Sequence, residues 1–447
     1  MNKNFNSHRV ELSINKLGIN GEGVARLDSY TLFVDGALPG EKVTATIEQR
    51  KKSYGRARIL SIEEPSKNRI SPLCSRFNDC GGCQIMHLEY QEQCRQKTAL
   101  VQDTLRHLGG FDDVDVSPCL ASPHPFHYRN KIQLPVTKRA GSIEMGFYRR
   151  GSHEIVSYDR CFVHHRSMEE SVEKIRQLLE HSGIEPYCEK SLSGSLRHVI
   201  IRSNNRGEQL IGLVTTGRQG SKLLKFAQKL MASLNSCIGV VKSVNDKAQN
   251  TIIGDKNYLL AGSAFLMEEI CGIEFKISLP SFFQVNPGAA QLLYEQALDF
   301  AEVDGAKTVL DAYCGIGTLS LISARHAKRV IGIECVEQAI VDAEENARHN
   351  NVDNAQFFCG RVEDFVHLFL DVDVAFINPP RKGVDPSVVD ALNAFGPKRL
   401  VYISCNPATL ARDAKMLIKY RLVKAQPVDM FPQTMHVESV VRFDRVA

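Results

Sequence analysis

The C-terminal third of the chain carries the pattern that most restricts its fold, because short apolar segments alternate there with segments of helical periodicity. An apolar strand followed by a helix is the repeating unit of a mainly parallel sheet. The pattern therefore predicts a doubly wound α/β domain. The expected strands cover Thr308–Asp311, Arg329–Glu334, Ala355–Cys359, Val372–Asn378 and Arg399–Ser404, and the expected helices start at Thr318, Val336 and Pro407.

Two further regions precede this domain in the chain of 447 residues. Residues 1–66 alternate short apolar and polar runs between glycines and prolines, which is typical of a small β-barrel. Residues 125–270 mix strand-like runs with helices expected over Met168–His181 and Ser221–Leu234, which indicates a mixed α/β domain. Between these regions, Tyr90–Leu108 has helical spacing and stops at Gly109-Gly110.

A glycine-containing turn follows the first strand of the alternating region. The strand carries Asp311 near its end, and Cys314-Gly315-Ile316-Gly317 then leads into a helix, so a ligand can approach the backbone there. Glu334 ends the next strand, 23 positions after Asp311, where a carboxylate suits the ribose hydroxyls of a nucleoside. This pattern resembles S-adenosylmethionine-dependent methyltransferases, and a NAD enzyme of the same fold is the alternative at this point.

Asn378 follows a later strand, within Ile377-Asn378-Pro379-Pro380-Arg381. The prolines fix the turn, so the Asn378 side chain should point into the crevice at the carboxyl ends of the strands. Methylation of an exocyclic amine is associated with an aromatic residue after Asn-Pro-Pro, and Arg381 stands there instead. The chain therefore departs from that class.

Cys405 lies where the strand Arg399–Ser404 meets the helix that begins at Pro407. A thiol near a helix N-terminus is expected to have a pKa below the roughly 8.5 of free cysteine. We therefore predict that Cys405 is a nucleophile, with Arg381 available to stabilise developing charge. A further buried cysteine is the plain alternative.

Glu438 is the candidate general base for this thiol. It lies in the C-terminal run His436-Val437-Glu438-Ser439 on an expected strand, so His436 and Glu438 share one face. A half-buried carboxylate beside an active-site thiol can accept a proton. A charge on a surface strand is the alternative.

Cys74, Cys80 and Cys83 lie within ten residues, with Gly81 and Gly82 between the last two. Thiolates on such a tight loop can converge on one soft centre. An iron–sulfur cluster and a zinc ion both need a fourth ligand, for which Cys161 is the candidate. The spacing is not that of a zinc-ribbon pair, so we favour a structural iron–sulfur cluster over zinc, and unrelated buried thiols are the alternative.

The charge of the chain is concentrated although its formal net value is only +4. Residues 1–70 carry 12 Lys and Arg against 8 Asp and Glu, and residues 129–166 carry 8 against 3. The run Gln49–Arg58 places five basic residues around Tyr54, which suits a phosphate backbone with a stacked base. We predict an RNA-facing polyanion footprint in these segments.

The N-terminus has no apolar signal core and no run of about 18 apolar residues occurs, which argues against a membrane span. The odd count of 13 cysteines fits a reducing, cytoplasmic location, where clustered thiols bind metals or react. We assign no function to the thiol of Cys314, and we expect seven other cysteines to be packing residues: Cys94, Cys119, Cys188, Cys237, Cys271, Cys335 and Cys359.

Taken together, these motifs resemble the RNA 5-methyluridine methyltransferases over nearly the whole chain. The motifs that carry the resemblance are Ser281-Phe282-Phe283-Gln284-Val285-Asn286, Asp311-Ala312-Tyr313-Cys314-Gly315, Asn378-Pro379-Pro380-Arg381, Ser404-Cys405-Asn406-Pro407 and His436-Val437-Glu438. The N-terminal barrel is similar to a TRAM domain. The four cysteines are similar to the 4Fe-4S ligands of the members that modify 23S ribosomal RNA, whereas tRNA T-loop members typically lack the barrel and the cluster.

The resemblance implies a role for each matching residue. Gln284, Tyr313, Glu334 and Asn378 would bind S-adenosylmethionine, Cys405 would be the nucleophile and Glu438 the base. Cys74, Cys80, Cys83 and Cys161 would hold the cluster. Many members have Asp at the position of Asn378, whose amide can still donate and accept hydrogen bonds.

The implied fold joins three parts. Residues 1–66 form the RNA-binding, OB-like TRAM barrel, residues 67–89 with 125–270 a central iron–sulfur and RNA-binding domain, and residues 90–124 with 271–447 a Rossmann-like methyltransferase domain. The implied reaction is methyl transfer to uridine C5 of 23S ribosomal RNA through a covalent bond from Cys405 to C6. The alternatives are a tRNA T-loop methyltransferase and an iron–sulfur RNA-binding protein with an inactive catalytic domain. No obligate protein partner is implied.

Overall fold

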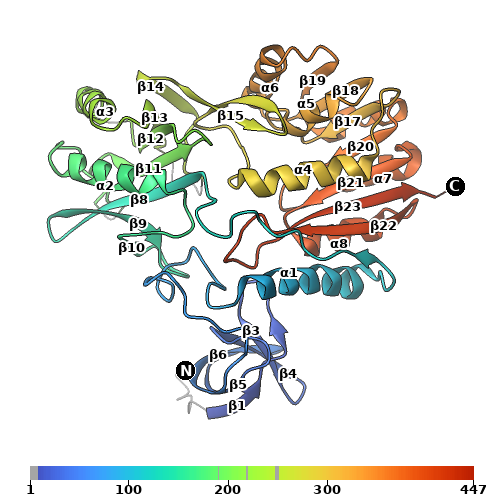
Figure 1. Ribbon diagram of the computed structural model, residues 1–447, viewed down its shortest axis with the longest axis horizontal. Coiled ribbons are helices and arrows are strands. Elements are labelled where there is room, and N and C mark those ends of the chain that lie inside the picture. The colour runs from blue at the N-terminus through green and yellow to red at the C-terminus, as the bar shows by residue number, and fades with distance from the viewer. Residues whose placement is uncertain (1–8, 190, 218–219, 247–250, 447) are drawn as a thin grey trace.

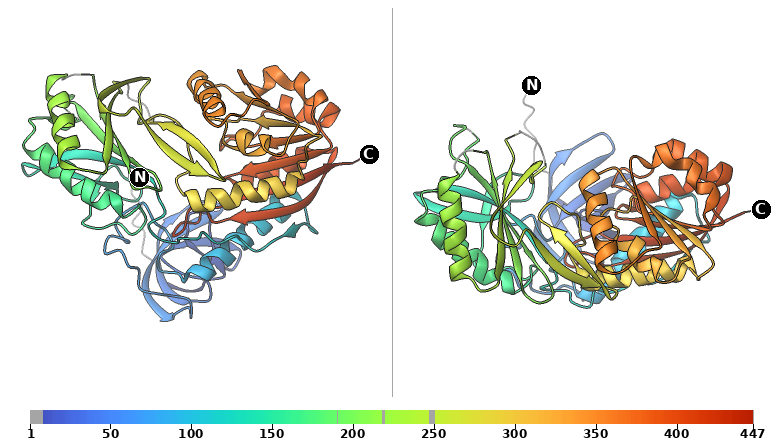
Figure 2. Two further views of the ribbon diagram at one scale, coloured as in Figure 1. Left: turned by 45° about the horizontal axis from the view of Figure 1, so that its top comes forward. Right: turned by 90° about the horizontal axis from the view of Figure 1, so that it is seen from above.

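The computed structural model describes residues 9–189, 191–217, 220–246 and 251–446. These residues form sheets of six, seven, two and eight strands. The first sheet is the blue barrel at the base of Figure 1, the second lies in the green part, and the eight-stranded sheet lies in the orange and red part. Figure 2 shows the green part and the orange to red part side by side, with the yellow β15–β16 hairpin between them.

The N-terminal part is a small, strongly curved sheet, as its alternating sequence predicts. Its strands pair in the order β1-β5-β6-β4-β3-β2 around an apolar core that includes Leu12, Leu32 and Val43. The basic run with Tyr54 is the hairpin between β5 and β6, and Lys51 lies 5.4 Å above the Tyr54 ring. The strands are β1 (Arg9–Ser13), β2 (Lys16–Leu17), β3 (Gly23–Leu27), β4 (Tyr30–Asp35), β5 (Lys42–Arg50) and β6 (Tyr54–Glu64).

The central part is a seven-stranded sheet with two helices, in agreement with the predicted mixture. Residues of both helices join one apolar cluster with the sheet, because each helix places its apolar side on the strands. Its strands are β8 (Lys131–Arg139), β9 (Ser142–Tyr148), β10 (Ile155–Ser157), β11 (Leu196–Ser203), β12 (Gln209–Thr215), β13 (Cys237–Val244) and β14 (Lys256–Gly262). Its helices are α2 (Ser167–Glu180) and α3 (Ser221–Ser233).

The C-terminal part confirms the predicted doubly wound arrangement. Its sheet has the order β19-β18-β17-β20-β21-β23-β22-β7, in which β23 runs antiparallel to both of its neighbours. The strands are β7 (Asp115–Val116), β17 (Thr308–Ala312), β18 (Arg329–Glu334), β19 (Ala355–Cys359), β20 (Val374–Ile377), β21 (Arg399–Ser404), β22 (Tyr420–Val428) and β23 (Glu438–Arg445). The preceding hairpin joins β15 (Phe265–Ile270) to β16 (Ile273–Ser278).

Helices cover both faces of this sheet through two separate apolar clusters. One cluster includes α4 and α5, and the other includes α1, α7 and α8. Three of these helices begin with an Asn or Asp cap and a proline, at Asn286, Asp385 and Asn406, which fixes where each helix starts. The helices are α1 (Tyr90–Thr104), α4 (Pro287–Ala301), α5 (Thr318–Ala324), α6 (Glu337–His349), α7 (Pro386–Phe395) and α8 (Pro407–Met416), with a π turn η1 (Leu105–Gly109) and a 3₁₀ segment η2 (Val362–Asp371).

Helix α1 attaches the early part of the chain to the C-terminal sheet. The buried ammonium of Lys97 forms an ion pair with buried Asp429 and donates to the carbonyl of Phe431 at 3.1 Å. The helix runs through its π turn and stops at Gly110, which is left-handed with φ of 78°. The predicted end of this helix at Gly109-Gly110 is therefore confirmed. None of the helices formed by the described residues is long and apolar enough to cross a membrane.

Candidate active site

A cavity of about 1020 Å³ opens at the carboxyl edge of the C-terminal sheet and extends to the cysteine-rich loop. Residues from the cysteine loop, the central sheet and the C-terminal sheet all line it. The structure brings every residue nominated from the sequence to this one cavity: Cys74, Cys80, Cys83, Cys161, Gln284, Tyr313, Glu334, Asn378, Cys405 and Glu438.

The turn after β17 forms one wall of this cavity. Tyr313 has a left-handed backbone with φ of 70°, which is uncommon for a residue other than glycine. Gly315 also has a positive φ, and a Cβ atom added there would meet nothing within 4 Å. The backbone at Gly315 therefore borders open space that a bound ligand can fill. Asp311 lies behind the turn, where burial raises its pKa to about 7 and the Ser320 hydroxyl donates to it at 2.6 Å.

Glu334 ends β18 beside this turn and faces the cavity. Its carboxylate accepts hydrogen bonds from the backbone N–H of Gly315 at 3.2 Å and of Val336 at 3.0 Å. These bonds orient the side chain and leave acceptor capacity on both oxygens, since a carboxylate has about four lone-pair sites. The position suits a pair of ribose hydroxyls.

Gln284 and Asn378 line the same cavity from other elements. Gln284 is buried just before α4, and its carbonyl accepts from the Asn130 amide at 3.5 Å. Asn378 follows β20, and its backbone N–H donates to the carbonyl of Ala312 at 3.4 Å. The two amides therefore border the space in front of the β17 turn.

Cys405 and Glu438 come together through the pairing of β21 with β23. Ser404, the last residue of β21, pairs with Ser439, so Cys405 and Glu438 each lie one residue beyond this pair at the cavity edge. Glu438 is buried, with 6% of its surface exposed, rather than half-buried as the sequence predicts. Burial raises the pKa of Glu438 to about 8, and the Arg381 guanidinium acts in the opposite direction.

The prediction of a lowered pKa for Cys405 is wrong in this structure. Burial and the neighbouring Glu438 carboxylate raise the pKa of the Cys405 thiol, and they outweigh Arg381, which lowers it through charge and a hydrogen bond. A helix N-terminus contributes only a fraction of a unit charge. The resting site therefore favours the neutral thiol, and Arg381 is the cation that opposes this tendency.

His436 lines the cavity, but the predicted strand does not include it. Strand β23 begins at Glu438, and His436 lies in the preceding loop with its side chain exposed. Burial of part of the ring lowers the pKa of His436, and Arg381 adds to this effect. The shared orientation of His436 and Glu438 toward the cavity comes from the loop and not from strand alternation.

The cysteine loop closes the other end of the cavity. Gly81 approaches β9 so closely that its N–H donates to the Tyr148 carbonyl at 2.9 Å, and an added Cβ would lie 3.0 Å from that oxygen. Partly buried Cys74, Cys83 and Cys161 pack against one apolar cluster. Burial raises the pKa of Cys161 to about 11, and Cys80 and Cys74 add to the shift, so these sulfur atoms lie near one another.

Among the described residues, no group of three or more His, Cys, Asp or Glu side chains is arranged to hold a metal ion. The four cysteines line one end of the cavity, and the described structure does not show them arranged as a metal site.

The expectation that the seven remaining cysteines are packing residues is wrong for three of them. Cys188, Cys335 and Cys359 are exposed. Cys335 directly follows β18 and Cys359 is the last residue of β19, so both lie where the chain leaves the sheet. The Cys335 thiol donates a hydrogen bond to the Glu334 carboxylate at 3.3 Å. Cys237 is buried and fits the expectation.

Several cavity residues were given no individual role in the sequence analysis. Phe282 is 71% exposed although it is a large apolar side chain in the cavity wall. Arg129 and Lys131 also line the cavity, and burial lowers the pKa of Lys131 to about 7. The basic composition of residues 129–166 was the available signal for these two cations.

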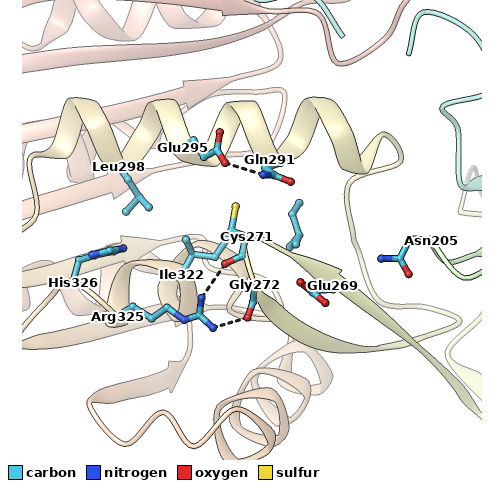
Figure 3. A pocket seen from close by; sticks show the side chains of 11 residues that line it. Asn205, Glu269, Cys271, Gly272, Gln291, Glu295, Leu298, Ile322, Arg325 and His326 are labelled. Carbon is cyan, nitrogen blue, oxygen red and sulfur yellow. Dashed lines mark hydrogen bonds between the residues drawn. The ribbon is translucent and has the colours of Figure 1, made fainter. Parts of the chain in front are cut away.

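Another cavity, of about 520 Å³, lies between the β15–β16 turn and helix α4 (Figure 3). Its wall is fixed by Arg325, whose guanidinium donates to the carbonyls of Cys271 and Gly272. The residues nominated from the sequence all line the larger cavity instead. The larger cavity is therefore the candidate active site.

Comparisons with known proteins identify the family to which the chain belongs. A family described as tRNA (uracil-5-)-methyltransferase matches residues 89–446, and the TRAM domain family matches residues 6–60. An uncharacterized RNA methyltransferase of Halalkalibacterium halodurans is 42% identical over 438 residues, which cover 96% of each chain. One of Listeria innocua is 42% identical over 441 residues, again 96% of each chain.

A solved structure is similar over the same extent. The tRNA (uracil-54, C5)-methyltransferase of Pyrococcus abyssi, in complex with S-adenosyl-L-homocysteine, has 29% sequence identity and a TM-score of 0.77. The match covers 97% of this chain and 100% of that one. Both the N-terminal barrel and the doubly wound part thus have counterparts among known proteins.

Proposed function

Because the chain belongs to the tRNA (uracil-5-)-methyltransferase family and carries a TRAM domain, we propose that it transfers a methyl group from S-adenosylmethionine to C5 of a uridine in 23S ribosomal RNA. Membership makes it an S-adenosylmethionine-dependent RNA methyltransferase with a Rossmann-like catalytic domain. Beyond family membership, we propose that Cys405 and Glu438 carry out the reaction and that 23S ribosomal RNA receives the methyl group.

The observation that carries the proposal is the meeting of Cys405 with Glu438 at the cavity edge. A thiol next to a buried carboxyl supplies a nucleophile and a group that exchanges a proton, from two strands held in register. The pKa of Glu438 is about 8, close to the range in which a general base is effective.

The proposed reaction uses both side chains in turn. Uracil C5 is a poor nucleophile, and addition of the Cys405 thiolate to C6 turns C5 into an enolate-like carbon. This carbon takes the methyl group that the sulfonium of S-adenosylmethionine supplies. Glu438 then removes the proton from C5, the C5–C6 double bond re-forms and the bond from Cys405 to C6 breaks.

Arg381 supports the first of these steps. Its guanidinium is the charge that lowers the pKa of Cys405 and also lowers that of Glu438. The thiolate therefore forms beside a fixed positive charge, while burial and the Glu438 carboxylate raise the pKa of the thiol and so disfavour the thiolate. We propose that binding of the uracil ring shifts this balance at the moment of attack.

The cofactor would occupy the space in front of the β17 turn. Open space at Gly315 and the oriented carboxylate of Glu334 fit the ribose of a nucleoside cofactor. We propose that Tyr313, Gln284 and Asn378 line the remainder of that site. Asn378 stands where many relatives carry an acid, and its amide still offers a donor and an acceptor.

The target uridine must leave its stack to reach Cys405, because C6 is inaccessible inside a helix. The exposed ring of Phe282 and the basic side chains of Arg129 and Lys131 line the same cavity. We propose that an unstacked loop of RNA enters here, while the hairpin with Tyr54 in the TRAM domain contacts the backbone nearby.

We propose that Cys74, Cys80, Cys83 and Cys161 hold a 4Fe-4S cluster. Partial burial, mutual proximity and the close approach that Gly81 permits all fit a bulky centre held by thiolates. The spacing of Cys74, Cys80 and Cys83 is not that of a zinc-ribbon pair, which is the reason for proposing a cluster and not a zinc ion. Its role would be structural.

The cysteine set is what favours ribosomal RNA over tRNA as the substrate in this proposal. The N-terminal barrel does not distinguish the two, contrary to the expectation from the sequence, because the Pyrococcus abyssi tRNA methyltransferase matches 97% of this chain. We propose that the chain has three domains. Residues 1–66 form the TRAM barrel, residues 67–89 with 125–270 form the central iron–sulfur and RNA-binding domain, and residues 90–124 with 271–447 form the methyltransferase domain. We further propose a cytoplasmic location, where thiols stay reduced. Methylation of a tRNA T-loop uridine is the alternative, because the similar Pyrococcus abyssi protein is a tRNA methyltransferase by its description.

A deletion strain tests the substrate directly. Nuclease digestion and mass spectrometry should show loss of 5-methyluridine from 23S ribosomal RNA, with tRNA unchanged, and a plasmid copy should restore it. Loss from tRNA alone would establish the alternative. Unchanged 5-methyluridine in both RNAs would contradict the proposed function.

A further inference from the structure

The cysteine loop and the loop that leads to Glu438 meet at one residue, Gln433. The carbonyl of Gln433 accepts hydrogen bonds from the backbone N–H groups of Gln84, at 2.9 Å, and of Ile85, at 3.1 Å. Gln84 directly follows Cys83, and Gln433 lies five positions before Glu438. One carbonyl therefore joins the proposed cluster-binding loop to the catalytic loop.

The side chain of Gln433 makes a second connection, to Gln93 on α1. The Gln93 amide donates to the Gln433 side-chain oxygen at 3.0 Å, and the Gln433 backbone N–H donates to the Gln93 side-chain oxygen at 3.0 Å. The Gln93 amide also donates to the carbonyls of Ile85 and Leu88. The Gln93 side chain is thus hydrogen-bonded both to the segment that follows the cysteine loop and to the loop that leads to Glu438.

Both amides are fully engaged in a buried environment. Gln93 and Gln433 are each 1% exposed, and the Gln433 amide also donates to the carbonyl of Pro125 at 3.2 Å. A buried polar group that loses its partner is costly, so such a network defines one arrangement of the chain. The network therefore resists sliding of one loop past the other.

The backbone of Gln433 must be left-handed for this arrangement, with φ of 70°. A residue other than glycine rarely adopts this conformation unless its surroundings require it. Here the conformation turns the Gln433 carbonyl toward Gln84 and Ile85. Around it, the Tyr128 hydroxyl donates to the Pro432 carbonyl, and Met435 packs with Ile85.

We propose that Gln433, held by Gln93, is a positioning residue that adds to the pairing of β21 with β23: it orients the loop leading to Glu438, and so Glu438 relative to Cys405, by tying that loop to the cysteine loop. The proposal rests on the proposed function. An intact cysteine loop then supports the geometry of the catalytic loop, because it supplies the Gln84 and Ile85 donors to the Gln433 carbonyl. Disorder in that loop would release the segment that ends at Glu438.

Two substitutions at Gln433 separate backbone coupling from simple packing. Gln433→Gly removes the side chain, but glycine adopts a left-handed φ readily. Gln433→Val fills more of the space of the native side chain than glycine does, but a β-branched residue disfavours a left-handed φ. The proposal expects the valine variant to lose the larger part of kcat, about 100-fold for a displaced catalytic group. A packing role predicts the reverse order, with glycine the more damaging change.

Gln93→Met tests the side-chain link, with Gln426→Met as the matched control. Gln426 is also a buried amide, 6% exposed, which donates to the carbonyls of Pro118 and Pro427. Each substitution removes two or more buried hydrogen bonds. Only the Gln93 bonds connect the cysteine loop with the loop that leads to Glu438. We expect Gln93→Met to lower kcat and to accumulate covalent RNA–protein adduct, with the dissociation constant for S-adenosylhomocysteine unchanged, and Gln426→Met to do neither.

Hydrogen–deuterium exchange measures the coupling without any turnover. In the full-length protein, Gln93→Met and Cys80→Ser should each raise exchange across residues 429–438, and the double variant should add little to either. Equal protection of that segment in Gln93→Met and Gln426→Met would overturn the coupling. If wild type methylates no RNA while exchange behaves as expected, the proposed function fails and the coupling stands.

Discussion

Cys405 and Glu438 are held at one edge of the C-terminal sheet because Ser404 pairs with Ser439 in the antiparallel contact of β21 with β23. The strand reversal at β23 is what allows this. The start of an antiparallel strand lies beside the ends of its parallel neighbours, so a residue near the C-terminus reaches the crevice where cofactors bind. The Glu438 carboxylate therefore lies close enough to raise the pKa of the Cys405 thiol.

The reactivity of the Cys405 thiol should depend on Glu438 and Arg381 in opposite directions. The Glu438 carboxylate raises the pKa of this thiol and Arg381 lowers it. We expect Glu438→Gln to shift the pH profile of Cys405 alkylation to lower pH, and Arg381→Gln to shift it to higher pH. Mass spectrometry of the iodoacetamide-labelled peptide follows the rate, and identical profiles in the two variants would refute the electrostatic account.

The stability of the ligand-free protein should carry the signature of the buried Glu438 carboxyl. Its pKa rises from 4.5 to about 8 on folding, so the folded state binds this proton more tightly than the unfolded state. Stability from this group is therefore present below pH 4.5 and is lost as pH rises toward 8. Glu438→Gln should gain melting temperature relative to wild type between about pH 5 and about pH 9, and a constant difference would contradict the shift.

Cofactor affinity should depend on Glu334. Replacing the carboxylate by an amide in Glu334→Gln weakens hydrogen bonds to a charged acceptor, which contribute about 1.5–3 kcal/mol each. We expect S-adenosylhomocysteine to bind roughly 10- to 100-fold more weakly by titration calorimetry. Glu337→Gln, three residues further along and outside the cavity lining, is the control and should bind as wild type does.

The cluster proposal predicts a brown protein when purification is anaerobic. Cys80→Ser should lose the visible absorbance and most of the iron, because a thiolate ligand is missing. Cys359→Ser, which changes an exposed thiol at the end of β19, should keep both. Stoichiometric zinc without iron in the wild-type protein would reject the cluster.

Much of the fold could be predicted from the sequence because local signals agree with it. The alternation of strands and helices from Thr308 onward follows from apolar periodicity. The predicted helix start at Pro407 follows Asn406, which is a local cap signal, and the stop at Gly110 follows from its left-handed backbone. Asn286 and Asp385 give the same signal before Pro287 and Pro386, although these two starts were not predicted.

The properties of the site were less predictable because they depend on tertiary neighbours. Cys405 has the helix position that lowers a thiol pKa, yet burial and Glu438 reverse the sign. His436 has the alternation expected of a strand but lies in a loop. The left-handed backbone of Gln433 has no local signal, because contacts to Gln84 and Gln93 impose it.

The most direct test of the account is the capture of its covalent intermediate. Glu438→Gln, incubated with S-adenosylmethionine and 23S ribosomal RNA from a deletion strain, should give an RNA–protein species that survives denaturing electrophoresis. Mass spectrometry should find a methylated uridine attached to the sulfur of Cys405, and Cys405→Ala should form none. Full methyl transfer by Cys405→Ala, or a uridine attached to another residue, would contradict the proposed mechanism.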